Sequence, residues 1–513
     1  MKSMKKNILK ISTSAFLLLW ASSCSSDFLE VPLQGKPTAD TDPNLVQNLV
    51  IGVYNSLLTG ESFGAEGDIH GFAFVSATNI LSDDAEKGST PIDQQQTAGV
   101  LDDFSVTSTN SFVQALWSGH YNGIAKVNNA LAIIEASNQD DATKKRLSGE
   151  VRFIRGYYYF NLVRWFGAVP KITRVPKDAS DANNDPVFQT RASVDEIYQL
   201  ITDDLQFGAD NLPLKTQTGP GRISKGTAQA MLAKVYMYRK QWQKAYDLSK
   251  EVMNSGQYDL LPDYSTIWRQ AGDNSREDVF EVQTGQFNNS DFGISNYSMS
   301  QGPRVGGLGG WTDLGWGFGT PSPSLVSAYE PGDLRMNSTI IFIDNSGKHT
   351  GTTLFDGFRI PSADSVQNLR YNYKAYHSEN KNVENWLGNR DKKQKNLHLL
   401  RFAEVLLINA EAANELGKPA EAIVNLNRVR QRAGLKALTV GSQTQVREAV
   451  WQERHVELAL EHDRFFDLVR TGRAAQVLSV TNKNFRAGVN ELLPIPSLQI
   501  ALSGGKLTQN NGY

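Results

Sequence analysis

Residues 228–252 read AQAMLAKVYMYRKQWQKAYDLSKEV, and their apolar side chains follow a helical period. The first of them recur at i, i+3, i+4, i+7 and i+8, the spacing of one helix face; they are Ala228, Met231, Leu232, Val235 and Tyr236. After a break at Lys240–Gln241, a second apolar stripe starts at Ala245. The stretch therefore predicts two helices, which the short turn between them forces to be antiparallel.

A second pair of helices is expected further along the chain, at residues 402–429. Its first apolar stripe stops at Gly417 and its second at Gly434, where glycine can cap a helix. When the two pairs are aligned, Lys240 matches Gly417, and small residues occupy matched positions that let the helices approach closely. This arrangement resembles the tetratricopeptide repeat, a helix–turn–helix unit of 34 residues. We therefore expect a mostly α-helical protein built on a tetratricopeptide-like scaffold.

Two long irregular insertions interrupt this scaffold. We expect the repeat helices near residues 111–166, 193–255, 398–432 and 445–470, and the insertions near 63–104 and 284–398. The segment Gly285–Pro323 holds eight glycines between Gly302 and Gly319. Because glycine destabilises helices, we expect no helix in this segment. Long loops inside compact domains are usually functional, so the insertions are where we expect the ligand site.

The composition is that of an ordinary globular protein. The 513 residues include 52 Lys and Arg against 54 Asp and Glu, a formal net charge of −2, and 40% are hydrophobic. Disordered and collagen-like chains are excluded, and the near-neutral charge gives no sign of a nucleic-acid partner. The single cysteine excludes an internal disulfide and a cysteine-built metal site.

The N-terminus combines a positively charged stretch with a short apolar one. Lys2, Lys5, Lys6 and Lys10 come first, and the apolar segment 11–20 is too short to span a bilayer, so it is typical of a secretory signal. The only cysteine, Cys24, follows small residues where cleavage is expected, as in a bacterial lipoprotein signal. The alternative is plain secretory cleavage that leaves a free thiol. We expect a signal peptide over 1–23, a lipid-anchored leash over 24–42 and one helical body over 43–513.

Four sequence blocks together resemble the SusD/RagB family of outer-membrane lipoproteins. They are RFIRGYYYFNLVRWFGAVP at 152–170, RISKGTAQAMLAKVY at 222–236, LRFAEVLLINAEA at 400–412 and ERHVELALEHDRFFDLVRTG at 453–472. The LPIP at 493–496 and the last seven residues also look like the family's ending. The blocks occur in order, and the resemblance covers nearly the whole chain after Cys24.

The resemblance implies a function. Proteins of this family sit on the outer surface of Bacteroidetes-type bacteria and cap a TonB-dependent barrel of the SusC type. They capture a nutrient, most often an oligosaccharide and sometimes a peptide, and pass it to the barrel. They are binding proteins and not enzymes, so we expect no cofactor. A glycan-binding importer subunit is our leading prediction; a peptide-binding subunit and a surface glycoside hydrolase are the alternatives.

The glycine-rich segment of the second insertion is the expected glycan site. The C–H face of a sugar ring packs on a flat aromatic ring, and its hydroxyls need planar groups such as Asp, Asn, Gln and Arg. The predicted ligand-binding residues are Trp311, Trp316, Phe318, Tyr297 and Arg304, together with Asp83 from the first insertion. The alternative is that these rings fold inward onto the core and that Asp83 and Asp84 are solvated loop charges.

Sequence motifs for catalysis are absent. His455 and His462 are seven residues apart and could share a helix face, but no HExxH motif accompanies them. Neither a Gly-x-Ser-x-Gly motif nor a P-loop is present. We therefore predict no catalytic residue and no metal ligand, and whether a metal ion is bound stays open. We expect Arg464, Asp467, Glu457 and Glu461 to take part in a buried ion network that fixes helix geometry.

Overall fold

The computed structural model describes residues 44–60, 67–284, 295–304, 315–343, 353–360, 362–378, 380, 382–384, 395–481 and 483–513. Cys24, the predicted signal peptide, the predicted leash and Trp311 lie outside these residues. Within them, no helix has both the length and the apolar character needed to cross a membrane. Residues 48–513 belong to one structural unit.

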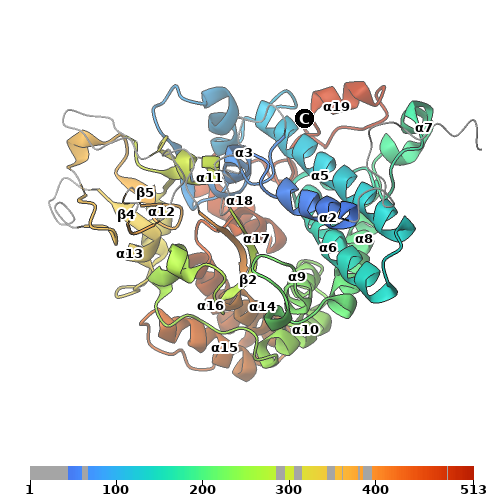
Figure 1. Cartoon of the computed structure of the whole chain (residues 1–513). Coiled ribbons are helices and arrows are strands. Elements are labelled where there is room, and N and C mark those ends of the chain that lie inside the picture. Colours follow the sequence, from blue (N-terminus) through green and yellow to red (C-terminus); the bar gives the residue numbers. More distant parts are fainter. Residues whose placement is uncertain are drawn as a thin grey trace, which may run out of the picture. The chain divides into compact units, whose positions relative to one another are not determined.

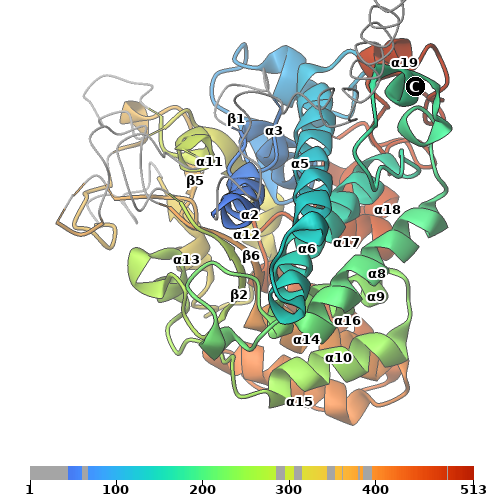
Figure 2. The same cartoon turned by 45° about the vertical axis from the view of Figure 1, so that its right-hand side comes forward.

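Long helices make up the scaffold. They are α5 (Ser111–Ala136), α6 (Asp141–Phe166), α8 (Val194–Asn211), α9 (Lys225–Tyr238), α10 (Trp242–Asn254), α14 (Phe402–Glu415), α15 (Pro419–Arg432) and α16 (Gln443–Glu457). Each packs on the next in turn, α5 on α6, α6 on α8, α8 on α9, α9 on α10 and α10 on α14, and α14 packs on both α15 and α16. The hairpins α9–α10 and α14–α15 thus lie side by side although they are far apart in the sequence (Figures 1 and 2). The predicted mostly helical, tetratricopeptide-like fold is confirmed.

The two hairpins turn in the same way at the residues that the sequence aligned. Lys240 follows α9 and Gly417 follows α14, and both are left-handed, with φ of 54° and 75°. In each turn the third N–H beyond the helix donates to the last-turn carbonyl five residues back, Gln241 N to Tyr236 O and Lys418 N to Ala413 O, both at 2.9 Å. This is the Schellman motif, which satisfies carbonyls that the helix end leaves unpaired.

Small residues lie where the helices meet. Ala233 and Ala245 in the first hairpin are fully buried, and so are Ala410 and Ala422 at the matched positions of the second. A methyl side chain lets two helix backbones approach closely, because it fills little space between them. The alignment of small residues therefore corresponds to a real interface.

The insertions consist of short elements and two-stranded sheets. The first contains α3 (Phe72–Val75), the π-helical turn η2 (Ser76–Ile80), β1 (Ala85–Gly88), η3 (Gln95–Gly99) and α4 (Val100–Asp102). The second contains α11 (Ser295–Gln301), β3 (Phe318–Pro321), α12 (Pro323–Ala328), α13 (Met336–Thr339), β4 (Ile340–Phe342), β5 (Arg370–Asn372) and β6 (Leu397–Arg401). The antiparallel pairs are β1–β3, β4–β5, and β6 with β2 (Asp278–Val282). The remaining helices are α2 (Leu45–Ser56), α7 (Ala179–Asn184), α17 (Arg464–Arg470), α18 (Ala474–Leu478) and α19 (Ser497–Leu502).

One expectation about the second insertion is wrong. The segment Gly285–Pro323 does contain a helix, α11, over residues 295–301. Its sequence SNYSMSQ has no glycine, and the helix ends just before Gly302, where the run of eight glycines begins. The glycines of this segment therefore do not exclude a helix in the neighbouring stretch that has none.

Candidate functional site

The pairing of β1 with β3 brings the two insertions together. Gly88 in the first lies opposite Phe318 in the second. Beyond the strands the chains stay in contact, because the Ser89 N–H donates to the Gly317 carbonyl at 2.7 Å. Gly317 in turn donates to the Gly302 carbonyl at 2.9 Å, next to the end of α11. The loop after β1, the end of α11 and the start of β3 thus form one edge of the protein.

Arg304 connects three segments at this edge. Its guanidinium Nη1 donates to the Ser89 hydroxyl at 2.5 Å and pairs with the Asp93 carboxylate. Its backbone carbonyl accepts from the Gln367 N–H at 3.0 Å, and Asn368 Oδ1 accepts from the Ser89 N–H at 3.1 Å. We call the group Ser89, Asp93, Arg304, Trp316 and Asn368 the Arg304 site.

The charged pair of this site is open to solvent. The side chains of Arg304 and Asp93 are 32% and 29% exposed. Hydrogen bonds from Thr90 and Ser89, together with the Arg304 guanidinium, lower the pKa of Asp93 to about 2. The aspartate is therefore ionised at neutral pH, when it can accept hydrogen bonds but cannot donate a proton. Paired planar groups of this kind match the vicinal hydroxyls of a sugar.

A buried lysine holds the backbone of the loop that carries Asp93. The buried Lys87 ammonium donates to the Thr90 carbonyl at 2.7 Å and to the Asp93 carbonyl at 2.9 Å. The loop then exposes Ile92 and Gln96 to solvent. Because the backbone is held by a buried cation, the Asp93 carboxylate keeps a defined position at the surface.

Trp316 lies next to Gly317, whose backbone is against Arg304. It is half-buried, and its backbone N–H donates to the Met299 carbonyl at 2.7 Å. Its neighbour Gly317 lies against Arg304, so close that a Cβ at Gly317 would come within 2.9 Å of the arginine Cβ. One edge of the ring faces Phe72, with centroids 6.4 Å apart. The indole therefore contacts Phe72 and is half-buried, and the backbone next to it lies against Arg304.

Two predicted site residues lie in the interior. The Phe318 ring packs on Phe72 with a centroid distance of 4.5 Å, and only 4% of the residue is exposed. Tyr297 is also buried, and its hydroxyl lies 3.4 Å from His462 Nε2. In this structure both rings fold inward and hold the second insertion to the core. Of the predicted aromatic residues that the structure describes, Trp316 alone reaches the surface.

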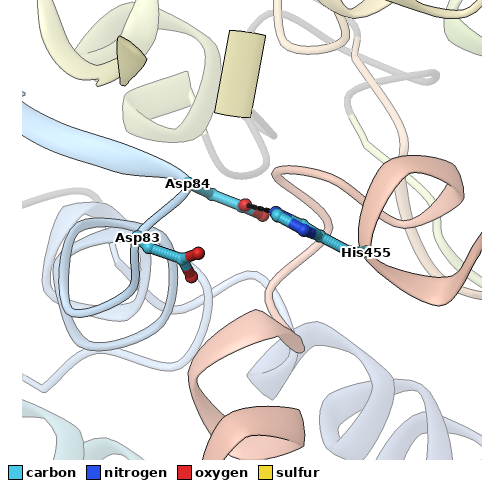
Figure 3. A group of neighbouring side chains, drawn as sticks. All are labelled: Asp83, Asp84 and His455. Carbon is cyan, nitrogen blue, oxygen red and sulfur yellow. Dashed lines mark hydrogen bonds and ion pairs between the residues drawn. The ribbon is translucent and has the colours of Figure 1, made fainter. Parts of the chain in front are cut away.

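The expectation that Asp83 and Asp84 are solvated loop charges is wrong. Asp84 Oδ1 accepts from His455 Nε2 at 2.7 Å, and the two side chains point toward each other in Figure 3. The Asp83 carboxylate lies beside this pair in Figure 3 and forms two bonds with Arg464, at 2.7 and 2.8 Å. Asp83, Asp84 and His455 are buried, and Arg464 is partly buried. The bonds between Asp83 and Arg464 therefore connect the first insertion to the C-terminal part of the chain.

His455 and His462 do not share a helix face. His455 lies in the last turn of α16, whereas His462 follows the helix with a left-handed φ of 76°. His462 is buried, and its Nδ1 bonds to the Thr78 hydroxyl at 2.8 Å. Each histidine therefore meets a different part of the first insertion, because the chain reverses direction between them.

The predicted buried ion network exists, but the four predicted residues do not pair with one another. Each of them pairs with other residues. Glu457 lies within 3.0 Å of three guanidinium groups, those of Arg335, Arg401 and Arg432. Glu461 pairs with Lys374 and Arg401, and Asp467 pairs with Arg454 and Arg470. Arg454 and Arg470 belong to the same 453–472 block, whereas Arg335, Lys374, Arg401 and Arg432 come from other segments of the chain.

A separate pocket lies near the C-terminus. It has a volume of about 490 Å³ and is lined by Phe104, Ser105, Val106, Thr107, Ser108, Asn484, Arg486, Gly512 and Tyr513. An aromatic ring, a guanidinium and amide groups converge there, as in many ligand sites. Sequence reasoning missed this pocket and also missed Asp93 and Ser89. The one local signal was the polar run Asp93 to Gln96, which offers four planar side chains in a row.

Comparisons with known proteins agree with this architecture. A family model described as the SusD family matches residues 276–513, and one described as starch-binding associating with outer membrane matches residues 68–237. SusD-like protein P2 of Formosa agariphila is 28% identical over 504 residues, 93% of each chain.

Solved structures match over nearly the whole chain. A laminarin binding SusD-like protein is 29% identical with a TM-score of 0.75, over 91% of this chain and 99% of that one. Surface glycan-binding protein A from Bacteroides fluxus is 26% identical with a TM-score of 0.74, over 93% and 100% of the two chains.

Proposed function

The chain belongs to the SusD family, and from this we propose that it is a glycan-binding subunit of an outer-membrane nutrient importer. The observation that carries the proposal is the Arg304 site, where a partly exposed ion pair and a half-buried tryptophan come from segments that contact each other. A sugar ring stacked on Trp316 would direct its hydroxyls to the Arg304 guanidinium and the Asp93 carboxylate.

Laminarin is the ligand to test first. The solved relative with 29% identity is a laminarin binding protein, and it covers nearly all of this chain. Trp311, seven residues beyond Arg304, is proposed to add a second ring to the same site. Phe318, Tyr297 and Asp83 are proposed to support the site through the packing described above rather than to touch the sugar.

We propose binding without catalysis at this site. A glycoside hydrolase needs one carboxyl group that is protonated near neutral pH and acts as the acid. The Asp93 carboxylate has a pKa lowered to about 2 and is therefore fitted to accept hydrogen bonds from hydroxyls. The expected result is that laminarin releases no new reducing ends during incubation with the protein.

The proposal includes a membrane anchor and a partner. Cys24 would carry the lipid that holds the protein at the outer surface of the outer membrane, and a SusC-type TonB-dependent barrel would receive the glycan. These two points rest on the family and on the N-terminal sequence. Mass spectrometry of the N-terminal peptide and co-purification with the barrel would test them.

Affinity electrophoresis tests the binding site. The protein is run through gels with and without laminarin, beside gels that contain other plant, microbial and host polysaccharides. The double variant Trp316→Ala/Arg304→Ala is expected to bind at least about 10-fold more weakly, since a stacked ring and charge-assisted hydrogen bonds each contribute about 1–2 kcal/mol. Trp242→Ala, at another half-buried tryptophan on α10, is the matched control and should bind like the wild type.

Other outcomes would place the binding site elsewhere or favour a different function. Retardation that survives the double variant but is lost in Arg486→Ala would place the site in the 490 Å³ pocket near Tyr513. Binding of peptides with no retardation by any polysaccharide would favour a peptide importer. Release of reducing ends would favour a hydrolase.

A further inference from the structure

Two buried clusters in the described part of the chain bring a histidine and two carboxylates together. One is Asp83, Asp84 and His455; the other is Asp273, Glu281 and His398. In each cluster, one potential ligand atom per residue lies within 4.8 Å of the others. Their chemistry differs, because the charges of the first are already compensated by the protein.

In the first cluster the carboxylate oxygens already have partners. Both Asp83 oxygens bond to Arg464, at 2.7 and 2.8 Å. Asp84 accepts from the His455 ring at 2.7 Å and from the Leu460 N–H at 3.4 Å (Figure 3). A guanidinium in the shell repels a metal ion and occupies the electron pairs that would bind it.

The second cluster is built differently. Glu281 on β2 lies directly opposite His398 on β6, and both side chains are buried. Glu281 accepts one hydrogen bond at each oxygen, from Asn274 N and Asn396 Nδ2, both at 2.8 Å. The Asp273 carboxylate makes no hydrogen bond or ion pair within the described residues. Neither carboxylate is paired with a lysine or an arginine there, unlike Asp83, Glu457 or Asp467.

The two nearby lysines are already bonded to backbone oxygens. Lys215 Nζ donates to the Ser275 and Asp278 carbonyls at 2.5 and 2.6 Å. Lys395 Nζ donates to the Trp268 carbonyl at 2.5 Å. Both are close enough to reduce the negative potential of the cluster, but neither occupies the oxygens of Asp273 or Glu281.

His398 is oriented as a metal ligand would be. Its Nδ1 is 2.6 Å from Asp278 Oδ1, and the other oxygen of Asp278 is held by Ser275 N at 2.6 Å and Ser275 Oγ at 2.9 Å. A carboxylate on one ring nitrogen fixes the tautomer and the ring position of a metal-bound histidine. The other nitrogen, Nε2, has no hydrogen-bond partner in the described residues, although only 5% of His398 is exposed.

A pocket reaches one member of the cluster, Glu281. This pocket of about 190 Å³ is lined by Asn274, Asp278 and Glu281 together with residues 218–224. Such a pocket can hold the water that completes a shell of three protein ligands. Ligand atoms around Zn²⁺ lie about 3.3–3.6 Å apart, given bond lengths of about 2.0–2.2 Å. A small rotation of Asp273, which no partner restrains, would close the shell.

We propose that Asp273, Glu281 and His398 bind a divalent transition-metal ion of the zinc class, with Asp278 as the positioning residue for His398. One imidazole and two carboxylates suit such an ion, whereas Ca²⁺ takes six to eight oxygens and Mg²⁺ requires a nearly ideal octahedron of them. The ion would clip the loop at Asp273 to the β2–β6 pair that leads into α14, so it is a structural site and independent of glycan binding.

Metal binding to purified, untagged protein tests this. After dialysis against chelator and then metal-free buffer, Zn²⁺ titrated by calorimetry should bind at one equivalent per chain. Asp273→Asn should weaken the affinity at least about 10-fold without loss of fold, because that carboxylate holds nothing else. His398→Gln should abolish stoichiometric binding, and the matched control His455→Gln should bind like the wild type. Co²⁺ should give a visible absorption band that Asp273→Asn weakens and His398→Gln removes.

Three results would overturn the proposal. The first is no stoichiometric Zn²⁺ binding by the wild type. The second is equal binding by wild type, Asp273→Asn and His398→Gln, since the ion would then lie elsewhere. The third is tighter binding of Ca²⁺ than of Zn²⁺, which would exclude the zinc class. Circular dichroism of each variant separates loss of the ligand from loss of the fold.

Discussion

At the scale of single residues, the partner of a charge determines what the charge does. Asp83 is a candidate ligand by sequence, but its carboxylate is almost completely buried and both of its oxygens bond to Arg464. Burial raises the pKa of the Asp83 carboxyl, but the hydrogen bonds and the charge of Arg464 outweigh burial and lower this pKa to about 2. Asp93 has a similar pKa but is solvent-exposed, so it can meet a ligand.

We predict that Asp83→Asn lowers the free energy of unfolding by about 3 kcal/mol, because it leaves a buried guanidinium without its counter-charge. Laminarin retardation should be unchanged under conditions where the variant is folded. Urea unfolding at pH 7 measures the loss. Asp203→Asn, at an exposed carboxylate, is the control and should change stability by less than about 0.5 kcal/mol.

The same pair predicts a pH dependence. Because the folded-state pKa of Asp83 lies below its ordinary value, the stability that the ionised carboxylate contributes is complete above about pH 5. It is lost as the pH falls toward about 2. The difference between wild type and Asp83→Asn should therefore be constant from pH 5 to 7 and shrink below pH 4. A difference that grows on acidification would contradict the assignment.

At the scale of elements, the turn of each hairpin depends on one left-handed residue. Gly417 adopts this conformation without a Cβ penalty, whereas Lys240 adopts it with one. Each turn is closed by the hydrogen bond that the residue after the left-handed one donates back to the last turn of the helix. The sequence alignment of Lys240 with Gly417 thus reflects a shared backbone geometry and not a shared side chain.

Substitutions at these two positions should have opposite effects. Gly417→Ala should destabilise the protein by about 1 kcal/mol, because alanine is strained at positive φ. Lys240→Gly should stabilise it by about 0.5 kcal/mol, because relief of the same strain exceeds the entropy lost by glycine. Thermal and urea unfolding of both variants measure the signs. Effects of the same sign would show that the turns differ in energy despite their matching geometry.

At the scale of the whole molecule, buried ion pairs join the second insertion to the scaffold. Arg335, beside α13, pairs with Glu453 and Glu457 of α16 at 2.6 and 3.0 Å. Lys374 pairs with Glu461 just beyond α16, at 2.6 Å. Burial raises the pKa of Glu457, but the positive charges of Arg432 and Arg401 outweigh burial and hold this pKa well below its ordinary value. These contacts connect segments that the chain separates by about eighty residues or more.

We predict that Glu457→Gln costs about 4 kcal/mol, since it leaves three buried arginines short of a counter-charge. Asp195→Asn is the control, because the Asp195–Arg239 pair is exposed and should contribute less than about 1 kcal/mol. Raising NaCl to about 1 M should leave the Glu457→Gln difference nearly unchanged, since salt screens buried pairs weakly. A difference that disappears in salt would show that the network is solvated.

The site was predictable only in part, for reasons that the individual residues make clear. The glycine-rich segment indicated Trp316 and Arg304, which are both partly exposed and whose segments contact each other through Gly317. It could not indicate Asp93, because the bond from Arg304 spans 211 positions of sequence. Nor could aromatic character separate Trp316 from Phe318, because both are candidate ligand rings and both contact Phe72; only the deeper burial of Phe318 distinguishes them. The glycan-binding role of these residues stays a prediction.

The sequence by itself determined the helical scaffold and the turns of its two hairpins, because helix period, end-capping and short turns depend on residues a few positions apart. The family followed from the resemblance of four sequence blocks. Only the tertiary structure decided which polar groups are buried and which face solvent. Asp83 meets Arg464 across 381 positions, and Glu281 faces His398 across two strands that are distant in the sequence. Such contacts are set by how the elements pack, and the local pattern that forms each element carries no record of its neighbours.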